Sequence, residues 1–499
     1  MPIKSFLFLV FIFLFSVANA QIHEGWTAEE YLLVETRLKN NIAHLDREVD
    51  TYLDIRYVPI KFHLVANSAG EGRVPVHDVF DQLCRLNQDF LANDIQFFIK
   101  DEFNFIDNDL LYEDHESVIE TIMEANRDTS SINVFIVKNI AEIVPIGAYY
   151  APIEDWVVIE QQQVNGEGIL LSHQIGHFFS LLHPFTGWGV GLMPYDEAMY
   201  GIQAPAISPD GSATETMDQS NCEEAGDFIC DTPPDYLFSE FIDCRYSGGV
   251  LDPNGQPVDP DEQLIMGYYF DCSREGYYFT PTQGQIMLSD LDSPQRAYLQ
   301  NAMPGNSAPI VGMPQLIVPT DGEFLPGTMV EFSWTPVANA AAYILEISRA
   351  PNFAFNNIQL IIYGTSLLAN NFEPNTTYYW RVRPFNNYDS CQPVTAAFSF
   401  ETGNVLAQTD INLPNFWAVF PNPISQGEHL NFLINNDRPF QGLLQVVSAN
   451  GQLLSQKELS LPAGNHRLSG PFSTLLPGIY WLRLRSEYGM NTQKLIISD

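Results

Sequence analysis

Three histidines within one apolar stretch constrain this chain more than any other feature of its sequence. The stretch reads LLSHQIGHFFSLLH over residues 170–183 and places histidines at 173, 177 and 183. On a helix, His173 and His177 would project from one face a single turn apart, so each could offer a ring nitrogen about 2.0–2.1 Å from one zinc ion. His183 can complete the set if the helix ends near Ser180 and the chain turns back. The spacing therefore predicts a zinc site.

The alternative is a core helix whose histidines make ordinary hydrogen bonds. A lone His-x-x-x-His pair often arises by chance, so His173 and His177 alone would not distinguish the two interpretations. The third histidine, together with the apolar residues that would bury the site, favours the metal.

The same residues resemble the His-Glu-x-x-His-x-x-Gly-x-x-His signature of the metzincin metallopeptidases. The segment 175–179, IGHFF, is similar to the pappalysin/cytophagalysin branch of that group. The resemblance implies a zinc-peptidase domain in which His173, His177 and His183 bind the metal. Two positions depart from the signature, because Gln174 stands where it has glutamate and Ser180 where it has glycine.

The residue at position 174 bears on catalysis. In the signature, a carboxylate takes a proton from the water on the zinc and passes it to the leaving amine. Gln174 can accept a hydrogen bond from that water, but an amide cannot act as a base at neutral pH. General acid–base catalysis contributes about 10²–10⁴-fold, so roughly that much rate should be missing. Metal binding should persist, because the signature glutamate is not a ligand.

The residue at position 180 bears on geometry. Glycine suits a helix end with positive φ, and another residue there costs about 1–2 kcal/mol. We therefore expect Ser180 either to be strained or to stand in a turn that is built differently. The placement of His183 depends on which of these holds.

Two further segments resemble the same family. The segment 264–268, LIMGY, resembles the Met-turn beneath a metzincin zinc, which implies that Met266 forms an apolar floor and that Tyr268 donates a hydrogen bond near the metal. Residues 147–160 resemble the strand and loop before the zinc helix, where an antiparallel edge strand would hold an extended peptide by backbone pairing. Such pairing does not need a glutamate at position 174, so peptide binding could outlast hydrolysis.

A calcium site is a second metal hypothesis. The segment 221–234 is similar to a cytophagalysin segment, and its Asp227 and Asp231 supply the oxygen ligands that Ca²⁺ prefers. The alternative is a turn in which these carboxylates cap backbone amides.

The chain has six cysteines, which predict disulfides if the protein is exported. Four of them follow the histidines: Cys222, Cys230, Cys244 and Cys272. Resemblance to pappalysin-like folds implies the interleaved pairs Cys222–Cys244 and Cys230–Cys272. We expect Cys84 and Cys391 to be free and buried, since they fall in different predicted domains. A zinc site made by the cysteine cluster is the weaker alternative, because Cys-x₂-Cys spacing is absent.

The amino-terminal residues 1–20 read as a secretory signal peptide, with Lys4 before an apolar core and an Ala-Asn-Ala cleavage site at 18–20. That core is too short for a comfortable membrane span, and no later stretch reaches about 20 apolar residues. We therefore expect an exported protein with no transmembrane anchor. The net charge of −38, from 61 acidic and 23 basic residues, would be repelled by nucleic acid, which excludes it as a partner.

The order of patterns predicts the domains that precede the linker. Residues 21–54 are charged and helical in pattern and form a lead-in or pro-segment. Residues 55–303 form the metzincin-like domain. In this domain 57–65 and 132–137 read as strands, as does 95–105, and residues 75–93 carry an apolar stripe at helical spacing.

After a linker rich in proline and glycine, the patterns are all-β. Residues 309–403 resemble a fibronectin type III domain, with Trp334 in its core and Tyr378 as a tyrosine corner. Residues 415–499 resemble the type A sorting domain of bacterial type IX secretion, through Pro-Asn-Pro at 421–423, Gly-Ile-Tyr at 478–480 and a basic, apolar terminus. This resemblance implies the type IX secretion machinery as a partner, and a secreted or cell-surface protein.

The sequence therefore predicts an α+β metzincin-like zinc domain followed by two all-β sandwich domains. Two functions remain open. In the first, the protein is a pseudopeptidase that keeps zinc and a peptide-binding cleft, since no other carboxylate near the helix, Glu167 included, is placed by sequence to replace the glutamate. In the second, it is an active or specialised zinc metalloendopeptidase that cleaves extracellular proteins or peptides. A third possibility is that the site holds no metal.

Overall fold

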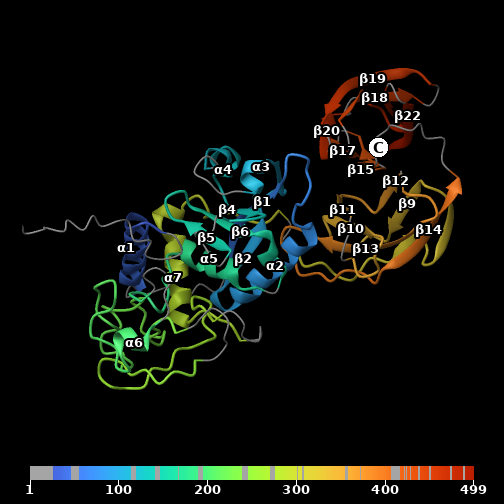
Figure 1. The fold of residues 1–499 in the computed structure, drawn as a ribbon. Coiled ribbons are helices and arrows are strands. Elements are labelled where there is room, and N and C mark those ends of the chain that lie inside the picture. The colour runs from blue at the N-terminus through green and yellow to red at the C-terminus, as the bar shows by residue number, and fades with distance from the viewer. Residues whose placement is uncertain are drawn as a thin grey trace, which may run out of the picture. The chain divides into compact units, whose positions relative to one another are not determined.

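The computed structural model of this chain combines helices and several β-sheets (Figure 1). The structure describes residues 26–45, 55–113, 120–140, 147–166, 168–188, 195–238, 246–269, 276–300, 302–305, 308–353, 358–370, 372–405, 416–420, 422, 424–426, 429–436, 439–448, 451–462, 464–471, 475–486 and 489–498. The signal-peptide segment therefore lies outside the described residues. Among the described residues, no helix has the length and apolar character that crossing a membrane requires.

The chain packs as two compact units. The first consists of Met1–Arg47, Ala151–Glu154 and Phe179–Met287, and the second of Glu48–Tyr150, Asp155–Phe178 and Leu288–Asp499. The described part of the first unit contains α1 (Ala28–Leu45), the short α6 (Glu197–Tyr200) and the larger part of α7 (Pro281–Asp292), joined by turns. Helix α1 lies in the segment expected to be helical, which confirms that expectation.

A sheet of six strands organises the amino-terminal part of the second unit. Its strands are β1 (Arg56–Ala66), β2 (Ile95–Ile99), β3 (Asn104–Asp107), β4 (Ile132–Val137), β5 (Ala148–Ala151) and β6 (Trp156–Glu160). Strand β1 pairs in parallel with β2, β3 and β4, and β4 pairs in parallel with β6. The strand order β2-β1-β4-β6-β5 leaves β5 at an edge. Strand β4 is buried at every position, as expected for a parallel strand covered on both faces.

The helices of this part are α2 (Val76–Asp89), α3 (Asp109–Glu113), α4 (Glu120–Asn126) and α5 (Leu170–Phe178), with 3₁₀ turns at Leu91–Asn93, Gln161–Gln163 and Pro294–Arg296. The predicted stripe on α2 is confirmed, because Val79, Leu83 and Leu86 are buried. The predicted strand at 95–105 divides into β2 and the start of β3. Helix α5 packs against α2 and β6.

The carboxy-terminal half is all-β, as the sequence predicts. Its strands are β7 (Leu316–Val318), β8 (Glu323–Gly327), β9 (Val330–Trp334), β10 (Ala342–Ser348), β11 (Ile358–Ile362), β12 (Ser366–Ala369), β13 (Thr377–Phe385), β14 (Phe398–Val405), β15 (Phe416–Phe420), β16 (Ile424–Ser425), β17 (His429–Asn436), β18 (Phe440–Ser448), β19 (Leu453–Leu461), β20 (Gly464–Pro471), β21 (Gly478–Ser486) and β22 (Gly489–Ser498). Trp334 lies in a buried core, and the hydroxyl of Tyr378 accepts a hydrogen bond from the Glu373 amide at 3.0 Å. This bond is the one expected of a tyrosine corner.

One sheet contains strands from both of the predicted β domains. Its order is β20-β17-β15-β12-β9-β7, and β12 meets β15 through the pair Ala369 and Ala418. Two further sheets, β11-β10-β13-β14-β8 and β16-β22-β21-β18-β19, complete the β-rich half. The two segments therefore share a sheet, which their separate sequence patterns do not reveal.

The structure corrects the pairing expected for the cysteines after the histidines. Cys222 bonds to Cys230, eight residues away, with Cα atoms 5.0 Å apart. The interleaved pairs Cys222–Cys244 and Cys230–Cys272 are therefore wrong. The reason is local, because successive turns between the two cysteines bring them together. Cys244 and Cys272 lie outside the described residues.

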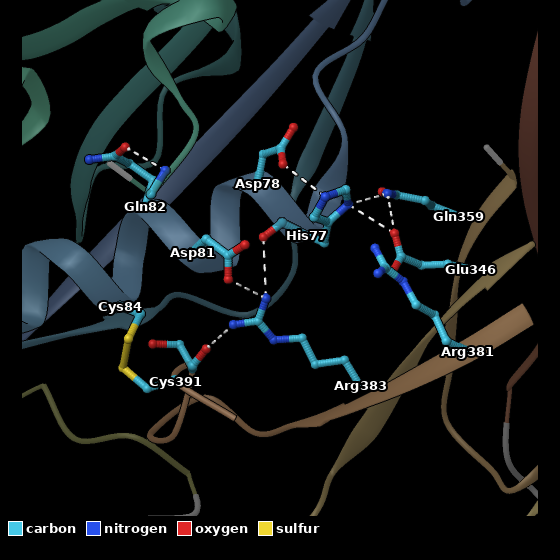
Figure 2. Close-up of polar contacts among 12 residues, drawn as sticks. His77, Asp78, Asp81, Gln82, Cys84, Glu346, Gln359, Arg381, Arg383 and Cys391 are labelled. Atoms are coloured by element: carbon cyan, nitrogen blue, oxygen red, sulfur yellow. Dashed lines mark hydrogen bonds and ion pairs between the residues drawn. A yellow bond between two sulfur atoms is a disulfide. The ribbon is translucent and has the colours of Figure 1, made fainter. Parts of the chain in front are cut away.

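The expectation that Cys84 and Cys391 are free is also wrong. The two form a disulfide across a sequence separation of 307 residues, with Cα atoms 4.9 Å apart. Figure 2 shows this bond between α2 and the β-rich half. Beside it, the Arg383 guanidinium donates to the Asp81 carboxylate at 2.6 Å. The sequence patterns place these cysteines in separate domains, and they do not reveal that α2 packs against the sheet that contains β10 and β13.

A polar cluster continues the same contact (Figure 2). The His77 ring lies 2.9 Å from Asp78 and 2.9 Å from Glu346, whose other oxygen accepts a hydrogen bond from Arg381 at 2.5 Å. Burial alone would lower the pKa of His77, but its hydrogen bonds and ion pairs with Asp78 and Glu346 raise that pKa to about 10. His77 is therefore a cation at neutral pH and joins α2 to β10.

This cluster predicts a pH-dependent contribution to stability. Because the pKa of His77 is higher in the folded protein than in the unfolded chain, its contribution is complete below pH about 6.5 and lost as the pH rises through about 10. We expect His77→Gln to lower the free energy of unfolding by about 1 kcal/mol at pH 6, a value kept modest by partial exposure. Urea unfolding at pH 6, 8 and 10 measures the difference. A difference that stays constant or grows with pH would contradict a protonated His77.

Candidate metal centre

Helix α5 carries two of the three histidines and is buried along its whole length. Nine residues are too few to form a stable helix alone, so packing must hold it. At its first turn, the Ser172 hydroxyl donates to the buried Asp89 carboxylate at 2.5 Å, and Arg85 pairs with the same carboxylate at 2.8 Å. Both partners come from α2. The residue just before His173 is thus tied to the neighbouring helix.

The other end of α5 is fixed by a buried arginine. The Arg296 guanidinium donates to the Phe178 carbonyl, the last of the helix, and lies 3.7 Å from the centre of the Phe178 ring. A cation is favoured at this position, because it binds a carbonyl at the carboxyl end of the helix, where the helix dipole is negative.

Two carboxylates form ion pairs with this arginine. Arg296 donates to both oxygens of Asp155, at 2.6 and 2.7 Å, and to Asp290 at 2.8 Å. Tyr150 and Tyr298 donate to the two oxygens of Asp155, at 2.7 and 2.6 Å. Burial would raise the pKa of Asp155, but Arg296 and these hydrogen bonds bring it below its usual value. The network stays charged and holds the helix end.

The chain leaves α5 through Phe179 and Ser180. Ser180 has a φ of 66°, the left-handed conformation that the signature glycine would adopt. The helix therefore ends where the sequence predicts, and the serine takes the disfavoured conformation. The buried Asn41 amide of α1 donates to the Ser180 hydroxyl at 2.8 Å.

This turn brings the three predicted ligands together. One ligand atom each from His173, His177 and His183 lies within 4.8 Å of the other two, and all three residues are buried. The Nε2 atoms of His173 and His177 are 3.1 Å apart. A tetrahedral zinc with bonds of about 2.0–2.1 Å sets its ligand nitrogens roughly 3.3 Å apart, so the residues fit the ion.

Aromatic rings surround the third histidine. The Tyr268 ring meets the His183 ring edge-on with centroids 4.8 Å apart, and the Phe185 ring stacks on the His183 ring at 4.5 Å. Met266 is fully buried, and the Gly267 amide closes a turn onto the Leu264 carbonyl at 3.0 Å. The structure thus places Tyr268 beside one predicted ligand and Met266 in a tight turn two residues before it.

Gln174 is fully buried on α5, between the two helical histidines. No carboxylate joins the three histidines in a metal-binding group among the described residues. The edge strand predicted at 147–160 is present as β5, next to β6.

The aspartates proposed for calcium have different surroundings. Asp231 accepts hydrogen bonds from the Thr280 hydroxyl at 2.7 Å and the Thr282 amide at 2.9 Å, so it caps the start of α7. Asp227 is buried, and its Oδ1 accepts from the Thr232 hydroxyl at 2.8 Å. Its Oδ2 and the Oε1 of the buried Glu215 have no hydrogen-bond partner within the part of the chain that the structure describes. Burial and the nearby Asp227 charge raise the pKa of Glu215 well above its usual value, and burial raises the pKa of Asp227.

Sequence reasoning missed several of these residues. Asn41 and Arg296 lie outside the histidine motif and are brought to Ser180 and Phe178 only by the fold, and Asp155 follows through Arg296. Glu215, whose pKa is raised by burial and by Asp227, was also missed. The scarcity of basic residues could have drawn attention to Arg296, because the chain has only 23 basic residues against 61 acidic ones. No spacing rule connects it with position 178.

The chain's carboxy-terminal part matches one protein family. Residues 418–498 match the family model described as "Secretion system C-terminal sorting domain". The match confirms the sorting domain expected from the sequence and indicates type IX secretion to the cell surface or the extracellular space. No curated protein matches the chain.

Solved structures that resemble the chain include fibronectin-III-like modules. The fn3 domain of human contactin 1 has 16% identity and a TM-score of 0.17, covering 22% of this chain and 94% of that one. The CbhA fibronectin(III)-like modules of Clostridium thermocellum have 8% identity and a TM-score of 0.15, covering 37% and 93%. A biofilm-associated protein, described by its BSP domain, has 14% identity and a TM-score of 0.23, covering 38% of this chain and 29% of that one.

The Arg296 network predicts a large stability loss on mutation. Arg296→Met would leave Asp155 and Asp290 as buried charges without their cation, so we expect it to lower the free energy of unfolding by about 3–5 kcal/mol. The matched control is Arg349→Met, which removes a half-exposed ion pair with Glu373 and should cost less than about 1 kcal/mol. Chemical denaturation compares the two. Equal losses would show that the buried network contributes no more than a surface pair.

Proposed function

We propose that this protein is an exported zinc-binding protein similar to the pappalysin-like metalloendopeptidases, in which peptide binding is kept and hydrolysis is impaired. The observation that carries the proposal is the buried group of His173, His177 and His183 with Gln174, not a carboxylate, beside it. Three neutral imidazoles are the ligand set of several catalytic zinc sites, which keep a fourth position for water or substrate.

A bound zinc would supply a Lewis acid that polarises a peptide carbonyl and lowers the pKa of a coordinated water to about 7. The chain's own residues then determine how far a reaction can proceed. His173, His177 and His183 would hold the ion. The Gln174 amide can orient a water but cannot take its proton, so the proton transfer to the leaving amine has no acceptor there. Tyr268, whose ring contacts that of His183, would donate a hydrogen bond near the metal, as the family resemblance implies.

Strand β5 is the element that we propose for peptide binding. It ends the six-stranded sheet, and an edge strand can pair with an extended peptide through main-chain hydrogen bonds. This capacity is independent of Gln174. A protein or peptide is therefore the proposed ligand, whether or not it is cleaved.

The alternative function is an active or specialised zinc metalloendopeptidase. It is favoured by the same histidine group, because a zinc held there would itself lower the pKa of water, and a base from another segment could take the place of the glutamate. The two functions share the metal and differ only in turnover.

The metal hypothesis predicts zinc in the purified protein. We expect elemental analysis to find one bound zinc. We also expect His183→Ala to weaken zinc binding by more than about 100-fold, since mutation of residues that only hydrogen-bond to metal ligands already lowers metal affinity about 10–100-fold. The control is His466→Ala, which alters a partly exposed histidine of the β-rich half and should leave the zinc in place. The metal hypothesis would be wrong if the natural protein contained no zinc. It would also be wrong if His466→Ala lost as much zinc as His183→Ala.

The pseudopeptidase hypothesis predicts a gain of activity. We expect the natural protein to cleave unfolded protein substrates slowly or not at all, and Gln174→Glu to raise kcat by about 10²-fold or more, because the restored carboxylate supplies general base catalysis. Zinc content, measured on both proteins, should be unchanged. Strong cleavage by the natural protein would favour the active peptidase instead.

We also propose a calcium ion between Glu215 and Asp227. Two buried carboxylates with oxygens that lack hydrogen-bond partners repel each other unless a proton or a cation lies between them. Calcium at 100 times its Kd should stabilise the fold by about 2.7 kcal/mol. We therefore expect Ca²⁺ to raise the unfolding midpoint of the natural protein and of the exposed control Glu223→Gln, but not that of Glu215→Gln. If Ca²⁺ does not change the unfolding midpoint of the natural protein, the calcium proposal is wrong and a shared proton explains how the two carboxylates are buried together.

A further inference from the structure

The lead-in helix α1 contacts the turn that leads to the third histidine. The buried Nδ2 atom of Asn41 donates to the Oγ atom of Ser180 at 2.8 Å. Ser180 is the residue with a φ of 66°, and His183 follows three residues later. A glycine at position 180 would adopt this φ more easily, but it would offer no side-chain oxygen to Asn41. The departure from the signature therefore creates a bond to another element.

Helix α1 has a capped first turn and one buried face, which together fix its position. Its first turn carries reciprocal caps, since the Thr27 amide donates to Glu30 at 2.7 Å and the Glu30 amide donates to the Thr27 hydroxyl at 3.3 Å. The buried residues Val34, Leu38 and Asn41 follow helical spacing and form one face.

A second contact fixes the same helix within its unit. The Lys39 ammonium lies 4.1 Å from the centre of the Phe228 ring, in the segment that contains the Cys222–Cys230 disulfide. Such cation–π contacts are favourable even near a surface. Helix α1 is thus seated by its own apolar face and by Lys39, so Asn41 is presented to Ser180 from a fixed position.

We propose that α1 is a permanent part of the metal centre, in which Asn41 acts as a positioning residue that holds the Ser180 turn ready for His183 to bind zinc. The bond offsets the unfavourable conformation of the serine and orders the turn before the metal arrives. A lead-in of this kind supports the site, in contrast to a pro-segment whose removal would activate it. This inference rests on the proposed zinc site.

A double-mutant cycle in the full-length protein tests it with Asn41→Ala, Ser180→Gly and the double variant. We expect Asn41→Ala to weaken zinc affinity by about 5–10-fold, as measured by competition with a chromophoric chelator, because zinc must then order the turn. In the Ser180→Gly background the same change should have less than about a twofold effect. The matched control is Asn40→Ala, which alters the exposed neighbour and should change nothing.

Two readouts separate positioning from general support of the fold. The visible absorption of the Co²⁺-substituted protein reports the geometry of the ligands, and we expect Asn41→Ala, but not Asn40→Ala, to change its intensity. Urea unfolding of the metal-free proteins reports the fold alone. If Asn41→Ala lowers stability but leaves zinc affinity and the Co²⁺ spectrum as in the natural protein, the proposal is overturned while the zinc site stands. A natural protein that binds no zinc overturns both.

Discussion

The site depends on how the chain leaves helix α5. Two histidines four residues apart lie on one face because of helix periodicity, but the third can reach them only if the helix stops and the backbone reverses. The structure makes this reversal at Ser180, with a positive φ in a non-glycine residue. Buried hydrogen bonds hold the residues on both sides of Phe179, since Arg296 donates to Phe178 and Asn41 to Ser180. Without this turn the sequence would still contain the motif, but His183 could not join the other two.

Some of the few basic side chains form partly or wholly buried ion pairs in this chain, which has 61 acidic and 23 basic residues. Arg296 pairs with both Asp155 and Asp290 inside the fold, and Arg383 pairs with Asp81 where α2 meets the β-rich half. These partly or wholly buried pairs are specific contacts, whereas the excess of carboxylates remains available for solvent and cations. Among the described residues, Glu215 and Asp227 have no such partner, since their pKa values rise with no basic side chain among the causes.

The sequence predicts the elements with local signals and fails where contacts are distant. The strands β1 and β4, the stripe on α2, the end of α5 near Ser180 and the tyrosine corner at Tyr378 follow from periodicity, spacing or turn chemistry. The Cys84–Cys391 disulfide could not be predicted, because 307 residues separate its ends and only the packing of α2 brings them together. The same holds for Asn41 and Arg296, whose partners are decided by tertiary packing. The wrong pairing of Cys222 came from a family resemblance that this segment does not follow.

The central claim is that three buried imidazoles bind one zinc ion in this protein. X-ray absorption at the zinc edge, measured on the purified full-length protein, tests it most directly because it reports both the kind and the distance of the ligand atoms. The account predicts a first shell of nitrogen and oxygen atoms at about 2.0–2.1 Å with the multiple-scattering pattern of about three imidazoles. A shell containing sulfur at about 2.3 Å, or a protein that takes up no zinc, would contradict it.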